Sequence, residues 1–382
     1  MKYLLILPGV LVLLVLIAVV RTLVSPRKTS DYQPPQTDEA EALRLAGKLS
    51  KMIQVDTTSH AGGDDPARFR AFHKTLAELF PRVFSQLEKT EIDGNLLFYW
   101  KGRSREKPIL LMSHQDVVPA EGAWSHAPFS GDIADGKVWG RGASDTKCSV
   151  MAFFEAAEQL LAEGYTPPTD VYLASSCTEE WAGDGAPKLV AELQRRGVEL
   201  FLVCDEGGAI ISEPIGGIPG NFAMVGVFEK GKADVKFTAK STGGHASAPK
   251  PHSPLVALSE ACTKIESHPF KAHVTKPVAE MFDTLGRYSN VTYRMIFANL
   301  WLFRPVLDAL CKKQGGEMNA LMRTTCAFTM MEGSRQSNVI PPQAKVGANL
   351  RLIGGDTMES ALRYLRATVR NPDIDITAVQ GM

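Results

Sequence analysis

Residues 110–116 read Leu-Leu-Met-Ser-His-Gln-Asp, an apolar run that ends in a histidine and an acid. With Ile109 before it, the run predicts a short buried strand, because brief apolar stretches of this length are typical of one. Residues two apart in an extended chain point to the same side, so His114 and Asp116 can face one pocket. A histidine capped by an acid at a strand end is also a common structural feature, and the pair alone leaves that interpretation open.

Similar apolar runs recur along the chain and alternate with stretches of helical periodicity. The predicted strands lie at 96–100, 109–112, 171–177 and 201–204, and the predicted helices at 39–53, 66–80, 149–163 and 186–196. Strands that alternate with helices predict an α/β domain with a mostly parallel sheet. We assign this domain to residues 39–218.

The pattern changes after a Gly/Pro-rich turn at 216–220. The predicted order is a strand at 233–241, a helix at 254–266, strands at 324–331 and 344–353, a helix at 357–369 and a strand at 373–379. This βαββαβ order predicts a ferredoxin-like α+β domain over residues 219–380. Residues 270–322 interrupt it as an insertion that is helical in places.

The N-terminus carries an unbroken apolar stretch, residues 3–20, preceded by Lys2 and followed by Arg21. It approaches the ~20 residues of a membrane-spanning helix and exceeds the ~7–15 of a signal-peptide core. We therefore expect residues 1–24 to be an uncleaved membrane anchor, with a cleaved signal as the alternative, and residues 25–38 to be a polar linker. The body is expected to be extracytoplasmic or lumenal, although the positive charges after the stretch favour a cytoplasmic body.

Composition excludes several classes of protein. The 382 residues include 42 Lys+Arg and 42 Asp+Glu, for a formal net charge of +0, so nucleic acid is not an expected partner. Six scattered cysteines lack the CxxC spacing of a metal site, and we expect them to be unpaired. A GxSxG motif is absent, which argues against a serine hydrolase.

Three further acidic motifs follow predicted strands or precede a helix. Asp145 lies in a glycine-flanked loop, Glu179 and Glu180 follow one strand, and Asp205 follows another. Each has a structural alternative, a helix N-cap for Asp145 and a solvated strand end or turn for the others. Together with His114 they form an oxygen-rich set at the sheet edge where ligands of open α/β sheets bind. Such a set suits two zinc-type ions that share a carboxylate, with one glutamate left as a base.

Three longer motifs resemble those of the M20 metallopeptidase family, in its carboxypeptidase S and N-acyl-amino-acid hydrolase branch. They are SHQDVVP at 113–119, WSHAPFSG at 124–131 and GRGASDTK at 140–147. The resemblance runs from about Glu39 to the end, with the motifs in the family's order and spacing. It implies a zinc-peptidase catalytic domain with an inserted lid domain.

The resemblance also implies a metal centre of two zinc ions, with cobalt or manganese as alternatives. His114 would bind one ion, Asp145 would bridge both, Glu180 would bind the second, and Asp205 would complete the first. Carboxylate and imidazole ligands of this kind suit zinc.

The remaining roles follow from the same resemblance. Glu179 would be the general base that takes a proton from water and returns it to the leaving amine, and Asp116 would orient His114. His245, in the motif TGGHASAP, would donate to the developing oxyanion, while Asn338 and Arg351 would hold the substrate's terminal carboxylate. Three other polar residues are expected to be structural: His126, Asp184 and Glu206.

The implied function is release of an amino acid with a free carboxylate from dipeptides or N-acyl amino acids, in a possible homodimer formed through the lid. The family's last histidine ligand lies far downstream, whereas all eight histidines here lie at or before His273. We therefore expect a fragment of a longer product, so that the catalytic domain is incomplete, or else a truncated inactive form. The competing function is a non-catalytic, membrane-tethered binding protein on the same fold.

Overall fold

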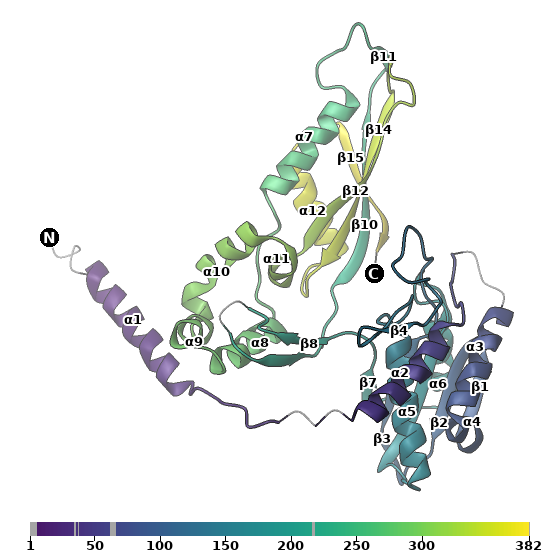
Figure 1. The fold of residues 1–382 in the computed structure, drawn as a ribbon. Helices are drawn as coiled ribbons and strands as arrows, with labels where there is room; N and C mark the ends of the chain where they lie inside the picture. Colours follow the sequence, from purple (N-terminus) through teal and green to yellow (C-terminus); the bar gives the residue numbers. More distant parts are fainter. Residues whose placement is uncertain (1–5, 34–35, 37, 62–65, 216–217, 382) are drawn as a thin grey trace. The chain divides into compact units, whose positions relative to one another are not determined.

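The computed structural model describes residues 6–33, 36, 38–61, 66–215 and 218–381. The chain forms two compact units (Figure 1), Tyr32–Gly207 and the combination of Met1–Asp31 with Gly208–Met382. We call them the α/β unit and the ferredoxin-like unit. Parts of three predicted features lie outside the described residues: the start of the anchor (1–5), part of the linker (34, 35 and 37) and part of the turn (216–217).

The α/β unit is built on a five-stranded sheet in the order β1-β2-β6-β3-β7. Its strands are β1 (Glu88–Ile92), β2 (Asn95–Trp100), β3 (Ser104–His114), β6 (Thr169–Ser176) and β7 (Leu202–Cys204). β3 is parallel to β6 and β7, whereas β2 is antiparallel to β1 and β6. The sheet is therefore mixed: β2 runs opposite to the other four strands, so the prediction of mostly parallel strands holds for all but β2. Asp93 and Gly94, with φ values of 48° and 86°, form the two-residue turn that reverses the chain between β1 and β2.

Helices cover both faces of this sheet. They are α2 (Glu39–Ile53), α3 (Pro66–Leu79), α4 (Pro81–Gln86), α5 (Lys147–Ala162) and α6 (Gly185–Arg195), and a small hairpin joins β4 (Ile133–Ala134) to β5 (Lys137–Val138). Alternate residues of β2 face opposite sides. Phe98 packs with α2 to α5, and Leu97 packs with α6. Four of these helices, α2, α3, α5 and α6, match predicted ones within two residues at each end.

A buried carboxylate joins α2 to α5. Glu155 accepts hydrogen bonds from Arg44 Nη2 and Lys48 Nζ, both at 2.5 Å, and from Gln159 Nε2 at 2.9 Å. Burial by itself would raise the pKa of Glu155, but these donors lower it from 4.5 to about 2. The charged carboxylate therefore stabilises the packing of α2 on α5.

We expect Glu155→Gln to lower the free energy of unfolding by about 2 kcal/mol at pH 7. Because the pKa is depressed in the folded state, this stabilisation is present above pH 4.5 and is lost as the pH falls towards about 2. Chemical denaturation of both proteins across this range measures it, with the exposed Glu163→Gln as control. A difference that stays constant down to pH 2 would contradict the expectation.

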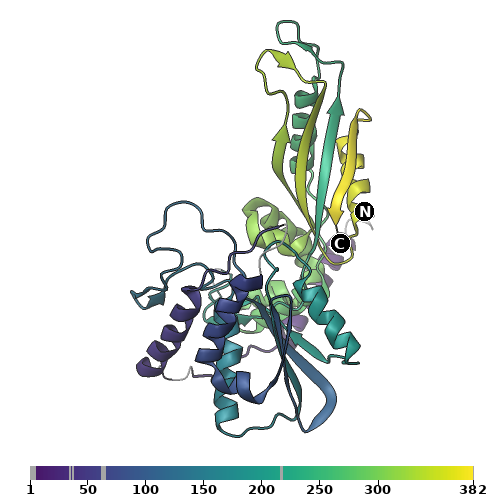
Figure 2. The ribbon, with the colours of Figure 1, turned by 90° about the vertical axis from the view of Figure 1, so that its right-hand side faces the viewer.

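The ferredoxin-like unit contains the predicted βαββαβ order. Its elements are β10 (Gly231–Lys240), α7 (Pro254–Ser267), β12 (Thr325–Glu332), β14 (Gln343–Leu352), α12 (Met358–Val369) and β15 (Ile374–Gly381). The strands form an antiparallel sheet in the order β12-β14-β10-β15, and α7 and α12 lie on one face of it (Figures 1 and 2). Two hairpins are attached: β8 (Ala209–Ser212) with β9 (Asn221–Met224), and β11 (Gly244–His245) with β13 (Val339–Ile340).

The insertion at 270–322 is helical, as expected, and has its own core. It contains α8 (Lys276–Arg287), α9 (Val291–Ala298), α10 (Leu300–Gln314) and α11 (Gly316–Met322), which bury Phe282, Phe297 and Met322 among other residues. The N-terminal helix α1 (Ile6–Val24) contacts this insertion. The buried Asn299 Nδ2 donates to Ala18 O at 3.0 Å and to Thr22 Oγ1 at 3.2 Å.

Helix α1 lies where the sequence predicts a membrane anchor. Among the described residues, however, no helix combines the length and the apolar content that crossing a membrane requires. The expected membrane-spanning helix at residues 1–24 is therefore unsupported.

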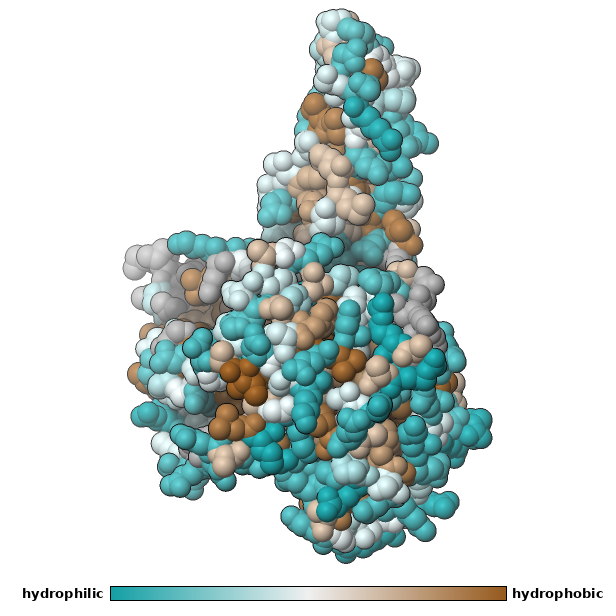
Figure 3. Space-filling model, turned by 45° about the vertical axis from the view of Figure 1, so that its right-hand side comes forward, coloured by the Kyte–Doolittle hydropathy of each residue, from teal (hydrophilic) through white to brown (hydrophobic). Residues whose placement is uncertain are grey.

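Apolar side chains gather mainly inside the two units, in cores formed between each sheet and its helices and within the insertion. On the face drawn in Figure 3, hydrophilic residues predominate and apolar residues form small, separate patches. This face is thus typical of an ordinary globular protein, whereas helix α1 exposes large apolar side chains such as Val12, Leu16 and Leu23.

Candidate metal and active site

The centre of the candidate site is His114, the last residue of β3. Its side chain is only 3% exposed, and Nδ1 lies 2.9 Å from the backbone oxygen of Asp116 and 3.4 Å from Asp116 Oδ1. Nδ1 therefore carries a proton and donates it to Asp116. A histidine fixed in this way presents Nε2 as its ligand nitrogen.

Carboxylates from three different loops surround this nitrogen. Nε2 lies 3.0 Å from Asp145 Oδ1, 3.0 Å from Glu206 Oε2 and 3.9 Å from Glu179 Oε2. Two sets of donor atoms lie within 4.8 Å of one another: His114 with Asp145 and Glu180, and His114 with Glu179 and Glu206. Side chains far apart in the sequence thus converge at one end of β3, within the α/β unit.

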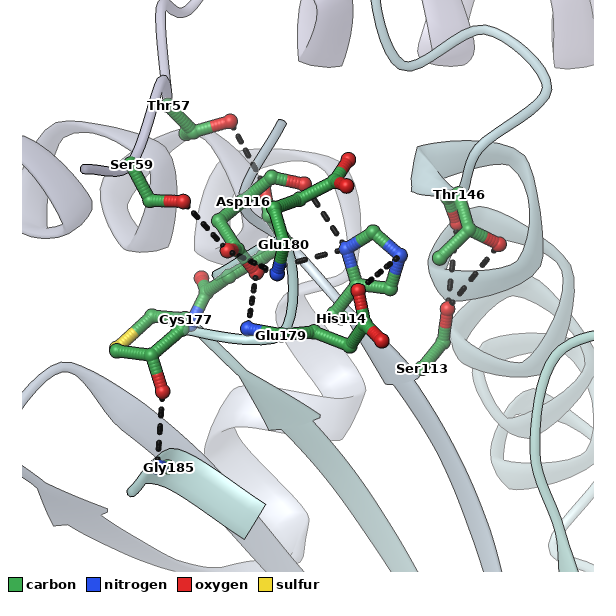
Figure 4. Close-up of polar contacts among 12 residues, drawn as sticks. Thr57, Ser59, Ser113, His114, Asp116, Thr146, Cys177, Glu179, Glu180 and Gly185 are labelled. Atoms are coloured by element: carbon green, nitrogen blue, oxygen red, sulfur yellow. Dashed lines mark hydrogen bonds and ion pairs between the residues drawn. The ribbon is translucent and has the colours of Figure 1, made fainter. Parts of the chain in front are cut away.

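Asp116 organises the residues around His114 (Figure 4). This fully buried carboxylate accepts a hydrogen bond from Ser59 Oγ at 2.7 Å and from the backbone N–H groups of Glu179 and Glu180 at 3.2 and 3.1 Å. Burial would raise the pKa of Asp116, but His114, Ser59 and the Glu180 N–H lower it. Asp116 therefore stays charged, and its contacts suit the predicted orienting role.

The Glu179–Glu180 turn is held from both sides. Cys177 N donates to Asn95 Oδ1 at 3.0 Å, and Gly185 N, at the start of α6, donates to Thr178 Oγ1 at 2.8 Å. Figure 4 shows the contact with Gly185 below the two glutamates. The turn that leaves β6 therefore places both glutamates at the carboxyl end of the strand, where ligands of α/β sheets bind.

Negative charge accumulates in this cluster. Burial, followed by the neighbouring carboxylates, raises the pKa of Glu179, Glu180 and Glu206, although His114 works against the rise. Burial would lower the pKa of His114, but Asp116 and Glu206 raise it to about 10. A bound cation would relieve the repulsion between these crowded carboxylates, whose pKa values are raised.

The donor set fits zinc or a similar ion. Tetrahedral zinc with ligands at about 2.0–2.1 Å has neighbouring ligand atoms about 3.3 Å apart, close to the 3.0 Å from His114 Nε2 to Asp145 and to Glu206. Imidazole with carboxylates also suits cobalt and manganese. The Asp145 and Glu179 side chains are 71% and 51% exposed, so one side of the cluster is open to a substrate.

The structure brings together His114, Asp145, Glu179 and Glu180, and it adds Glu206 to this cluster. Glu206, which the sequence analysis treats as structural, lies 3.0 Å from His114 Nε2. Asp205 belongs to neither donor set among the described residues but acts electrostatically on Glu179 and Glu206, and its role as a ligand stays a prediction. β7 ends at Cys204, so the alternation of an extended strand no longer decides which acid faces His114. The sequence does contain a signal for Glu206: it is adjacent to Asp205, so either acid could have been predicted as a metal ligand.

The other predicted residues lie in the ferredoxin-like unit. His245 is on β11, which pairs with β13 next to Asn338, and Ala246 N donates to Asn338 O at 3.0 Å. The β11–β13 hairpin lies near the end of β10, where Lys240 pairs with Gln343 of β14. Arg351 lies eight residues further along β14. Eight residues of strand span about 27 Å. In a single copy of the unit, Asn338 and Arg351 are therefore too far apart to hold one carboxylate together.

Two residues expected to be structural have structural contacts. His126 Nδ1 lies 2.9 Å from Asp132 Oδ2 and its ring stacks on Trp139, with ring centroids 4.5 Å apart. Asp184 precedes α6 and forms an ion pair with Lys188 at 3.0 Å.

Comparison with known proteins places this geometry in context. Residues 110–298 match the model of peptidase family M20/M25/M40, and residues 227–377 match a peptidase dimerisation domain. The probable carboxypeptidase S-like 2 of Dictyostelium discoideum is 33% identical over 98% of this chain and 74% of its own length. The N-fatty-acyl-amino acid synthase/hydrolase PM20D1.1 of Danio rerio is 34% identical over 92% of this chain and 69% of its own. Human carnosine dipeptidase 1 has a similar fold, with a TM-score of 0.58 at 15% identity over 90% of this chain and 78% of that one.

Proposed function

The chain belongs to peptidase family M20, a family of metallopeptidases and amidohydrolases, and we propose that it uses two zinc ions to hydrolyse an amide bond beside a free carboxylate. One observation carries the proposal. Asp145 and Glu206 converge on His114 Nε2 at 3.0 Å each, and Glu179 and Glu180 lie beside them.

His114, Asp145 and Glu180, whose donor atoms form one of the two sets, would hold the two ions, and Glu206, 3.0 Å from His114 Nε2, would add a further carboxylate. When bound, the ions would lower the pKa of a water molecule and polarise the amide carbonyl. Asp116 keeps His114 in the tautomer that binds metal through Nε2, because it accepts the Nδ1 proton.

Glu179 is the proposed general base. It is half exposed beside His114, and its raised pKa brings it closer to neutrality, where proton transfer in both directions is efficient. Glu179 takes a proton from the attacking water and returns it to the leaving amine. The backbone N–H that it donates to Asp116 fixes the turn from which its side chain extends.

His245 is the proposed donor to the developing oxyanion. Ser247 N donates to His245 Nδ1 at 3.2 Å, so Nδ1 accepts and the ring proton lies on Nε2, where it is available to substrate. Asn338 and Arg351 are the proposed ligands of the substrate's carboxylate. Their separation along one unit would require two copies of the chain, which agrees with the match to a dimerisation domain.

The proposed substrates are N-acyl amino acids and dipeptides. The similar proteins are named carboxypeptidase S-like, N-fatty-acyl-amino acid synthase/hydrolase and carnosine dipeptidase. Each name points to a substrate with an amide bond next to the carboxylate of an amino acid. The open side of the cluster at Asp145 and Glu179 supports entry of such an amide.

The test uses the purified full chain loaded with zinc and offered N-acyl amino acids and dipeptides. We expect release of a free amino acid, which a chelator stops and added zinc restores. Metal content is measured in parallel. Tight zinc binding without any release would instead favour a non-catalytic binding protein on the same fold.

A further inference from the structure

Lys147 is a fully buried lysine two residues after Asp145, and the mechanism above gives it no role. It is 0% exposed, its Nζ donates to Met52 O at 3.1 Å and to Val55 O at 2.7 Å, and it lies 5.0 Å from the centre of the Phe72 ring. Lysine is almost never fully buried without partners. A cation in the first turn of α5 also opposes the helix dipole, so this placement has a cost that local packing alone does not explain.

The acceptors of Lys147 lie at the end of α2 (Met52) and just after it (Val55), where the helix dipole makes a cation favourable. The loop that carries Asp145 also contacts this helix end. Gly140 has a φ of 148°, and a side chain there would lie 2.4 Å from Ile53 Cγ2, so only glycine allows the approach. Lys147 N donates to Gly142 O at 3.0 Å, which closes the loop around Asp145.

The chain that follows α2 holds the other half of the site. Thr57 Oγ1 donates to Gln115 O at 2.6 Å, and Val117 N donates to Thr57 O at 3.2 Å. Ser59 Oγ donates to Asp116 Oδ2 at 2.7 Å, and Asp116 in turn fixes His114. Hydrogen bonds at both ends, joined by the backbone of residues 55–59, therefore connect Lys147 to the residues that hold the imidazole.

We propose that Lys147 is a positioning residue for the metal centre. Its ammonium group joins the loop that carries Asp145 to the segment that holds Asp116, and so it sets the separation of Asp145 from His114. The inference rests on the proposed metal site. It assigns Lys147 a role in preorganising two ligands rather than in contact with substrate.

The experiment compares Lys147→Met with Lys48→Met in the full chain. Lys48 is the control for loss of a lysine beside α2: its Nζ donates to Leu79 O at 3.0 Å and to Glu155 Oε2 at 2.5 Å, and it lies 4.6 Å from the Phe80 ring. In the part of the chain that the structure describes, none of these contacts involves the loops that carry the metal ligands. Zinc and cobalt affinity are measured by competition with a chromophoric chelator. The visible spectrum of the cobalt form and the melting temperature are recorded for each protein.

We expect both variants to melt at lower temperature, but only Lys147→Met to bind metal more weakly, on the order of 10- to 100-fold, with an altered cobalt spectrum. Equal metal affinity in the two variants would overturn the inference while leaving the proposed function intact. An unsubstituted protein that binds neither metal would overturn both. If Lys147→Met does not fold, the same measurements are made on Lys147→Gln, whose amide keeps one hydrogen-bond donor. Unchanged metal affinity and an unchanged cobalt spectrum in that variant would refute the positioning role.

Discussion

Glu179→Gln is expected to reduce turnover on the order of 100- to 10,000-fold while the protein keeps its metal. The amide has nearly the shape of the carboxylate but cannot accept the proton of the attacking water. The metal should stay bound because one of the two donor sets, His114 with Asp145 and Glu180, does not include Glu179. Metal content and kcat, measured on the same preparation, separate the loss of the base from the loss of the site.

The pH profile provides a second measurement of the same role. A general base works only when deprotonated, so kcat/KM should fall as the pH drops through the raised pKa of Glu179. That acidic limb should be absent from the residual activity of the variant. Glu163→Gln, at an exposed position, is the control. Turnover close to normal in Glu179→Gln would refute the assignment.

Glu206→Gln is expected to weaken the binding of one metal ion by about 100-fold or more, and Asp205→Asn tests the neighbouring acid that the sequence predicts as a ligand. The reason is geometric: Glu206 Oε2 lies 3.0 Å from His114 Nε2, and Asp205 belongs to neither donor set in the part of the chain that the structure describes. An amide oxygen is a much weaker ligand for zinc than a carboxylate.

Zinc titration of both variants against a competing chelator provides this comparison directly. The two substitutions remove one negative charge each from neighbouring positions, so a general electrostatic effect would weaken binding in both. A larger loss in Asp205→Asn than in Glu206→Gln would restore the assignment made from the sequence.

The sequence by itself determined the elements and most of the candidate site. Apolar periodicity placed α2, α3, α5 and α6 and the βαββαβ order of the ferredoxin-like unit, because both signals are local and repeat with the geometry of the element. It also placed His114, Asp145, Glu179 and Glu180 at the ends of strands or beside a helix start, and the fold then brings these together. Only the reversed direction of β2 was missed, because the Asp93–Gly94 turn was not recognised.

Only the tertiary structure decided the features that depend on how the chain turns after an element ends. Glu206 reaches His114, which the sequence did not predict, because the alternation of side chains stops with β7 at Cys204. Arg351 and Asn338 lie far apart because one is near each end of a long strand pair, which a list of motifs does not reveal. The burial of Lys147 against the end of α2 joins residues almost a hundred positions apart, and no local pattern encodes such a contact.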